Sequence, residues 1–141
     1  MKLRVFLFED NETVREAFVE WLKLRGHEVI AFPDADRFCS GADTCLCGDK
    51  EICGDVLLCD VNLPGMTGLE LVTHLKEKKC LIPNVALMSG WWTEESRKEA
   101  ERLGFATFRK PVDMARIFEW VTDCETSTDA DRTLGSKFSR F

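Results

Sequence analysis

Short apolar runs of strand length alternate along the chain with segments in which apolar residues recur every three or four positions. The first run covers residues 3–8 and stops at an acidic cluster, and such continuous runs are typical of strands buried on both faces. The spacing of Val14, Phe18 and Leu22 then predicts an amphipathic helix that ends at Gly26. The same alternation predicts strands over residues 27–32, 55–59, 85–88 and 105–108, and helices over residues 67–78, 93–103 and 113–123.

Strands that alternate with helices predict parallel pairing, because the chain needs a crossover helix to return to the same edge of a sheet. The expected fold class is therefore α/β, a doubly wound five-stranded parallel sheet with helices on both faces. Two segments depart from this pattern. After a short helix predicted from about Asp34, residues 39–53 form a Cys-rich insert before the third strand. Residues 126–141 lack periodicity, which predicts a flexible C-terminal tail after a domain over residues 1–125.

The composition narrows the classes of function. The 141 residues are 45% hydrophobic and 31% charged, which suits one folded domain and argues against a disordered chain. A net charge of −6 and a pI near 5.0 disfavour direct binding to nucleic acid or to an anionic membrane. No apolar stretch approaches the roughly 20 residues that cross a bilayer. The N-terminus does not have the pattern of a secretion signal, so we expect a cytoplasmic protein.

Polar side chains gather where the predicted strands end. In a parallel α/β sheet, the functional crevice lies beyond the carboxyl ends of the strands. Three carboxylates at this edge repel one another unless a cation lies among them, and hard oxygen ligands favour Mg²⁺. An aspartate there can form an acyl phosphate, while a lysine and a hydroxyl can stabilise a transferring phosphoryl group. The residues in question are Glu9 and Asp10, Asp60, Ser89 and Lys110.

These motifs resemble those of the receiver domains of two-component response regulators, the CheY-like family. The resemblance runs from about residue 3 to residue 124 and rests on four motifs in a specific order and spacing. They are the acidic pair in FLFEDN, Asp60 in LLCDVNLPGMTGLEL, Ser89 in ALMSG, and Lys110 in FRKPV. The family resemblance implies a flavodoxin-like sheet with the strand order 2-1-3-4-5.

The resemblance also implies a function in a phosphorelay. A histidine kinase, a phosphotransfer protein or a small phosphodonor would transfer a phosphoryl group to Asp60, and the change would switch the binding of a downstream protein that the sequence does not identify. Such a protein is not an enzyme, apart from catalysing its own aspartyl phosphorylation and dephosphorylation. No output domain is recognisable after Cys124, which leaves open a stand-alone receiver and a piece of a longer regulator.

The family pattern assigns roles to the residues around the acceptor. Glu9, Asp10 and Asp60 would hold Mg²⁺ together with the backbone carbonyl of Asn62. Lys110 would act on the phosphoryl group and is expected to precede Pro111 through a cis peptide bond. Phosphorylation would also pull Ser89 inward and shift the face around the fourth helix and the fifth strand.

Two features depart from the family pattern. The family places an aromatic switch residue three positions before the lysine, but that position is Thr107, with Phe108 beside it, and the preceding segment is one residue short. Either the strand has a shifted register, or the family's usual coupling between the hydroxyl residue and the aromatic residue is absent. Trp91 lies two positions after Ser89, where the resemblance implies that side chains flank the path of the water that attacks the phosphorylated aspartate. Its bulk is predicted to slow dephosphorylation, or Trp91 and Trp92 cover the core edge or a partner surface.

Four cysteines form a symmetric pattern in the insert. Four thiolates in a short loop can hold zinc or an iron–sulfur cluster, although common zinc sites use pairs spaced by two to four residues, and here the intervals are five, one and five residues. Reversible disulfides and inert thiols stay open as alternatives. A redox-sensing or metal-sensing interaction module on a receiver scaffold is therefore the alternative function. Cys59 is expected in the core, and no role is assigned to Cys80 or Cys124. The four cysteines of the pattern are Cys39, Cys45, Cys47 and Cys53.

Two other classes of protein fit the sequence less well. Phosphatases of the haloacid-dehalogenase type use a second acid two residues after the nucleophilic aspartate, and here that position is Asn62. A flavodoxin-like flavin site would need a Ser/Thr/Gly loop after the first strand, but residues 9–12 carry three acids instead.

Overall fold

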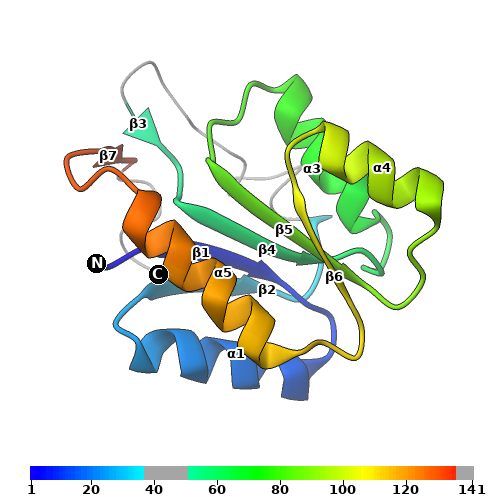
Figure 1. The fold of residues 1–141 in the computed structure, drawn as a ribbon, viewed down its shortest axis with the longest axis horizontal. Helices are drawn as coiled ribbons and strands as arrows, with labels where there is room; N and C mark the ends of the chain where they lie inside the picture. The colour runs from blue at the N-terminus through cyan, green and yellow to red at the C-terminus, as the bar shows by residue number, and fades with distance from the viewer. Residues whose placement is uncertain (37–50, 136–141) are drawn as a thin grey trace.

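The computed structural model describes residues 1–36 and 51–135. Five parallel strands form the central sheet in the order β2-β1-β4-β5-β6 (Figure 1). This is the order 2-1-3-4-5 when only the strands of this sheet are counted, so the predicted fold class is confirmed. The five strands are β1 (Arg4–Phe8), β2 (Glu28–Phe32), β4 (Val56–Asp60), β5 (Asn84–Ser89) and β6 (Ala106–Arg109).

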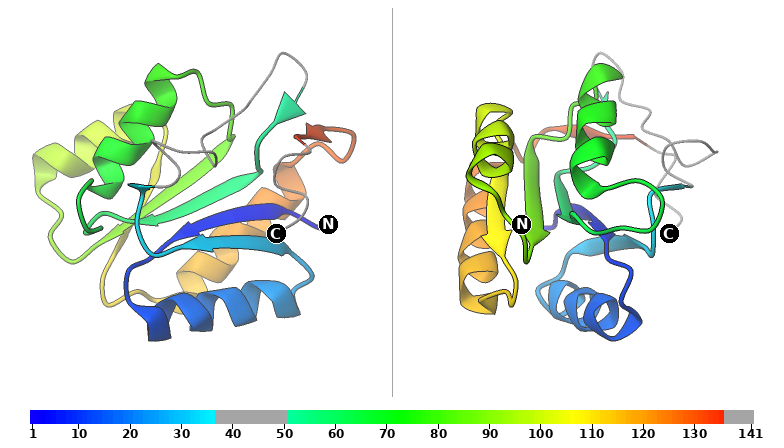
Figure 2. Two further views of the ribbon diagram at one scale, coloured as in Figure 1. Left: turned by 180° about the vertical axis from the view of Figure 1, so that it is seen from behind. Right: turned by 90° about the vertical axis from the view of Figure 1, so that its right-hand side faces the viewer.

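Helices cover both faces of this sheet. One apolar cluster joins the sheet to α1 (Glu12–Leu24) and α5 (Met114–Ser127). A second cluster joins the opposite face to α3 (Gly68–Glu77) and α4 (Glu94–Arg102). Accordingly, α5 crosses in front of the sheet in Figure 1, and α3 lies in front in the reverse view of Figure 2. Strands β1 and β4 lie between these layers and every one of their residues is buried, which explains their continuous apolar sequences.

Each described helix begins at a polar side chain that accepts a hydrogen bond from the first turn. Asn11 caps α1, Thr67 caps α3, and Asp113 caps α5. Thr93 caps α4 in a reciprocal capping box with Ser96. Each cap lies three to seven residues after the end of the preceding strand, and the site residues lie in these strand–helix junctions.

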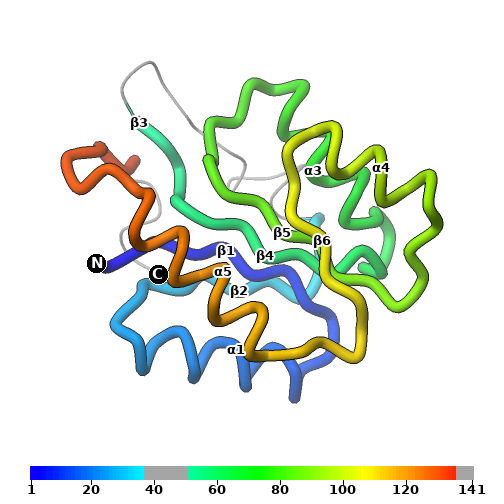
Figure 3. The backbone as a smooth tube through the Cα atoms, in the orientation of Figure 1, coloured from blue at the N-terminus to red at the C-terminus, as the bar shows by residue number. Residues whose placement is uncertain are grey.

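The chain after Cys124 differs from the flexible tail predicted for residues 126–141. The predicted domain end at residue 125 falls inside α5, and β7 (Thr133–Leu134) pairs in parallel with β3 (Glu51–Ile52). Figure 3 shows these two short strands at the end of the sheet that lies away from the carboxyl ends of β1 and β4. Arg132 binds the buried carboxylate of Asp55 with two hydrogen bonds of 2.6 and 2.7 Å. Residues 126–135 therefore make contacts that the prediction of a tail did not include, because long-range ion pairing leaves no periodic signal in the sequence.

Several predictions for the insert lie outside the described residues. Cys39, Cys45 and Cys47 belong to residues 37–50, and the short helix predicted from Asp34 would extend into the same range. Within residues 1–36 and 51–135, no helix has the length and apolar character needed to span a membrane.

Candidate phosphoacceptor site

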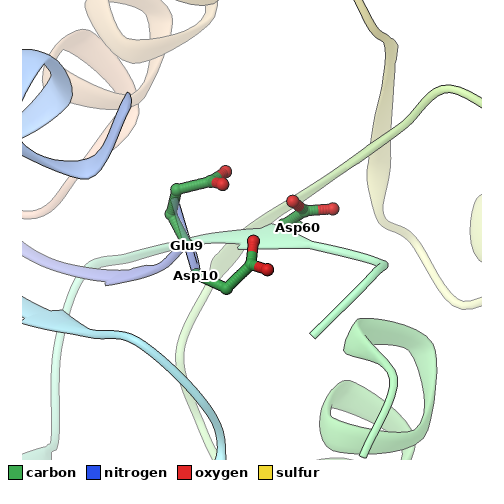
Figure 4. Close-up of side chains that lie close together, drawn as sticks. All are labelled: Glu9, Asp10 and Asp60. Carbon is green, nitrogen blue, oxygen red and sulfur yellow. The ribbon is translucent and has the colours of Figure 1, made fainter. Parts of the chain in front are cut away.

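Three carboxyl groups meet at the carboxyl end of the sheet. Glu9 and Asp10 follow β1, and Asp60 ends β4, the strand that pairs with β1 through Phe8 and Cys59. Oxygen atoms of the three carboxyl groups lie within 4.8 Å of one another (Figure 4). Glu9 and Asp60 are 1% and 2% exposed, whereas Asp10 is exposed to solvent. The structure thus brings together the acids that the sequence predicted as one site.

Lys110 reaches this cluster from the end of β6. Its Nζ donates to Asp60 Oδ2 at 2.5 Å and to Glu9 Oε2 at 3.5 Å. Its backbone N–H donates to the carbonyl of Ser89 at 2.9 Å, which fixes the end of β6 against β5. The bond between Lys110 and Pro111 is cis, as predicted from the resemblance.

The charges in the cluster are not balanced. Burial removes water from the Glu9 carboxylate and the charge of Asp60 lies beside it, and together they raise the pKa of Glu9 despite opposing hydrogen bonds. Burial disfavours the charged Lys110 ammonium, but the hydrogen bond and charge of Asp60, followed by those of Glu9, more than offset this and raise the pKa of Lys110. One ammonium group faces three carboxyl groups, so negative charge remains uncompensated.

The donor set fits a hard divalent cation. Carboxylate oxygens are the ligands that Mg²⁺ prefers, and here they lie close together with one exposed side. Asp60 is held from two directions, because Lys110 binds one of its oxygens and the Asn62 backbone N–H donates to the other at 2.9 Å. The backbone carbonyl of Asn62 as a further Mg²⁺ ligand stays a prediction.

Gly68 allows the acceptor strand and the next helix to approach closely. A Cβ atom at this position would lie 2.5 Å from the carbonyl oxygen of Asp60 and 2.9 Å from Cys59 Sγ. The Gly68 N–H donates to the carbonyl of Val61 at 2.8 Å, and Thr67 caps the helix that follows. The sequence signal for this contact is a glycine directly after a capping threonine, downstream of the acceptor strand.

A second supporting residue, Arg15, was not predicted. Its Nη1 donates to the carbonyl of Glu9 at 2.9 Å and to the carbonyl of Asp10 at 3.4 Å. Arg15 lies in the first turns of α1, and its position one helical turn after Asn11 is the signal that would have suggested it. The guanidinium group thus holds the backbone of the acidic loop.

Ser89 lies beside the acceptor on the neighbouring strand. It is 2% exposed and follows Met88, which is the register partner of Asp60. Its Oγ accepts a hydrogen bond from the Trp91 N–H at 3.0 Å. Trp91 is 84% exposed, so this side chain does not cover the core, whereas Trp92 packs against the apolar cluster beneath α3 and α4.

The register of β6 decides between the alternatives left open at positions 107 and 108. Thr107 pairs with Leu87 and Phe108 pairs with Met88 in a continuous parallel ladder. Phe108 packs edge-on against Trp120 of α5, at a centroid distance of 6.2 Å. Because successive side chains of a strand point to opposite faces, Thr107 faces the α4 side. Phe108 therefore does not stand in for an aromatic residue at position 107.

Of the predicted four-cysteine group, Cys53 is the member that lies within the described residues. Cys53 is buried, and its Sγ lies 3.9 Å from the Sγ of Cys80, to which no role was assigned. Cys59 is buried in the core as predicted. Burial raises the pKa of Cys124 to about 12. Zinc or an iron–sulfur cluster at the four predicted cysteines stays a prediction.

Comparison with known proteins identifies the family. The response regulator receiver domain family matches residues 5–122. The response regulator protein FleR of Pseudomonas aeruginosa is 30% identical over 122 residues, which cover 86% of this chain and 24% of FleR. A cyclic di-GMP phosphodiesterase of Thermotoga maritima is 30% identical over 115 residues, 79% of this chain and 28% of that protein. The chain thus spans less than a third of each of these relatives.

Solved structures show the same fold. The receiver domain of the Francisella response regulator 1452 has a TM-score of 0.74 at 16% sequence identity, with 90% of this chain and 99% of that chain covered. The Vibrio cholerae chemotaxis protein CheY4 has a TM-score of 0.64 at 18% identity, with 88% and 99% covered. The chain belongs to the response regulator receiver domain family and is a CheY-like receiver of a two-component system.

Proposed function

We propose that this receiver accepts a phosphoryl group on Asp60 in a Mg²⁺-dependent reaction. The observation that carries the proposal is the surroundings of this carboxylate. It is 2% exposed, bound by Lys110 at 2.5 Å and by the Asn62 N–H at 2.9 Å, and accompanied by two further carboxyl groups. A buried carboxylate in this setting is oriented for use as a nucleophile and lies beside a cation that can stabilise the product.

The reaction follows from the groups around the acceptor. A carboxylate oxygen of Asp60 attacks the phosphorus atom of a phosphohistidine or of a small acyl phosphate, and the bond from phosphorus to the donor breaks as the aspartyl phosphate forms. The Lys110 ammonium moves from the carboxylate to a phosphoryl oxygen, and the Ser89 hydroxyl donates to another. Glu9, Asp10 and Asp60, together with the Asn62 carbonyl, would hold Mg²⁺, which supplies positive charge against the phosphoryl oxygens.

We infer that the reaction serves as a switch in the cytoplasm and not as turnover of an external substrate. The phosphoryl group ends on the chain's own Asp60, and position 62 carries an asparagine where a phosphatase of the dehalogenase type needs a second acid. The partners are a histidine kinase or a phosphotransfer protein on one side and a downstream protein of unidentified class on the other. The net charge of −6 argues against direct contact with nucleic acid or an anionic membrane.

Mass spectrometry of the intact protein tests this function. The protein is incubated with acetyl phosphate with and without Mg²⁺, beside Asp60→Asn and the matched control Asp123→Asn, which changes an exposed aspartate of α5. We expect one added phosphoryl group on the wild type and on the control, only when Mg²⁺ is present, and none on Asp60→Asn. Equal labelling of Asp60→Asn would exclude Asp60 as the acceptor.

The contact between Cys53 and Cys80 favours redox sensing as a second candidate function. Their Sγ atoms are 3.9 Å apart, and Cys80 is partly exposed, so an oxidant can reach it. Hydrogen peroxide would convert the two thiols to a disulfide with release of two water molecules. Peptide mapping after peroxide treatment should recover this pair, with Cys124 as an internal control, because a thiol with a pKa of about 12 stays protonated at neutral pH. Recovery of unmodified Cys53 and Cys80 peptides would exclude the candidate.

A further inference from the structure

The loop between β5 and α4 is tied to the site at one end and to β6 at the other. At the site end, the Trp91 N–H donates to Ser89 Oγ at 3.0 Å. One residue later, the Trp92 indole Nε1 donates to the carbonyl of Phe108 at 2.9 Å. Two neighbouring residues therefore connect the phosphoacceptor pocket with β6, the strand that directly precedes Lys110.

Trp92 is the half-buried member of the tryptophan pair. Its ring packs against the apolar cluster beneath α3 and α4, whereas Trp91 points into solvent. Thr107 faces the α4 side of β6 without a ring of its own, and the Phe108 ring lies on the α5 side. Trp92 thus brings an aromatic ring to the α4 side of β6 and bonds to the residue next to Thr107.

We propose that Trp92 couples the phosphoacceptor pocket to the surface formed by α4 and β6. This inference rests on the proposed phosphorylation of Asp60, because the Ser89 hydroxyl must have a phosphoryl oxygen to engage. As Ser89 Oγ turns toward the acceptor, the Trp91 N–H follows it to keep its hydrogen bond, and the loop moves with it. The Trp92 indole then leaves the Phe108 carbonyl, and the edge of the α4–β6 surface changes shape.

The indole N–H groups report this movement directly. The chain contains four tryptophans, so a ¹H–¹⁵N spectrum of the full chain shows four indole signals, and Trp92 is assigned by its loss in Trp92→Phe. Mg²⁺ and beryllium fluoride, a mimic of the phosphoryl group, are then added. We expect the Trp92 indole signal to shift and its hydrogen exchange to accelerate. Trp21, which stacks on Phe118 between α1 and α5, should keep its signal and serves as the reference.

Two variants and one matched control separate coupling from a structural role. Trp92→Phe keeps an apolar ring but cannot donate the hydrogen bond, so beryllium fluoride should still bind while the shifts of the α4 and β6 amides are lost. The matched control Trp91→Phe should keep those shifts. Ser89→Ala should abolish the Trp92 shift, because the hydroxyl that moves the loop is missing.

The outcomes distinguish the coupling from the proposed function. The coupling is overturned, and the phosphoacceptor function is not, if the ¹⁹F spectrum shows bound beryllium fluoride while the Trp92 indole signal stays as unperturbed as that of Trp21. Full α4 and β6 shifts in Trp92→Phe overturn it as well. If no bound ¹⁹F signal forms on the wild type, the phosphoacceptor function fails, and the coupling fails with it.

Discussion

Two aspartates flank the buried strand β4, and their surroundings are opposite in character. Asp55 precedes the strand and is fully buried; Arg132 binds both of its oxygens, and the Arg4 N–H donates to Oδ2 at 2.8 Å. Asp60 ends the strand, shares Lys110 with Glu9, and also lies close to the carboxyl group of Asp10. Asp55, whose charge is paired with Arg132, anchors the chain. Asp60, which lies in a cluster with surplus negative charge, can take up a cation and a phosphoryl group.

The largest expected effects come from replacing each of the two aspartates by asparagine, because one variant should lose stability and the other should lose phosphoryl uptake. Asp55→Asn removes a buried charge and leaves the Arg132 guanidinium without its carboxylate partner, so we expect a loss of about 3 kcal/mol in the free energy of unfolding. Asp60→Asn should not lose stability, because it relieves repulsion with Glu9, but it should lose all phosphoryl uptake. Urea unfolding and intact-mass labelling of both variants measure the two properties. If Asp55→Asn unfolds at the same urea concentration as the wild type, the ion pair between Asp55 and Arg132 does not stabilise the fold.

Gly68 tests how closely α3 must approach the acceptor. Gly68→Ala places a Cβ atom 2.5 Å from the Asp60 carbonyl oxygen, and overpacking of this kind costs about 2 kcal/mol. We also expect slower phosphoryl uptake, because the end of β4 must shift. Gly90→Ala is the matched control, since its Cβ atom would contact only the Lys110 Cβ at 3.9 Å. Equal unfolding midpoints for both variants would contradict the close approach.

The pH dependence of the free energy of unfolding tests the excess of negative charge around Asp60. Burial and Asp60 raise the pKa of Glu9, so the folded chain holds this proton more tightly than the unfolded chain does. The stabilisation from the protonated Glu9 carboxyl is therefore present at low pH. It is lost as the pH rises from 4.5, the usual pKa of a glutamate, through the raised pKa of Glu9 in the folded chain. Without Mg²⁺, Glu9→Gln should gain stability relative to the wild type as the pH rises through this window.

Mg²⁺ should reverse the advantage of this variant. A cation bound among the carboxylates stabilises the folded wild type, by about 2.7 kcal/mol at a concentration one hundred times its dissociation constant. Glu9→Gln should gain less from the same addition. Urea midpoints from pH 4 to pH 7, with and without Mg²⁺, measure both effects, and a pH-independent difference between the two proteins would rule out Glu9 as the titrating group.

The smallest expected change in stability concerns Trp91. Its side chain is 84% exposed, so Trp91→Ala should alter the free energy of unfolding by no more than about 0.5 kcal/mol. We nevertheless expect faster loss of the phosphoryl group, because the resemblance to receiver domains implies that a bulky side chain two residues after Ser89 obstructs the attacking water. The decay of the phosphorylated form, followed by intact mass, tests this. An unchanged lifetime would leave Trp91 free for contact with a partner.

Much of the site could be predicted because it depends on topology. Parallel strands bring their carboxyl ends to one edge, so residues that directly follow the strands, such as Asp10, Asp60 and Lys110, must come together. The role of Trp92 could not be predicted in this way. Its hydrogen bond to the Phe108 carbonyl depends on the path of a loop, which leaves no periodic signal.

The sequence by itself predicted the alternation of strands and helices and the acidic edge, because hydrophobic periodicity is a local property that parallel topology converts into neighbours. The motif spacing indicated the family, and the family resemblance in turn implied the strand order. Only the tertiary structure decided which of the two aspartates beside β4 is neutralised. Asp55 meets Arg132 across 77 positions of the chain, and Asp60 meets Lys110 across 50. Such pairings depend on the packing of the whole fold, and they separate the anchored end of the sheet from the reactive one.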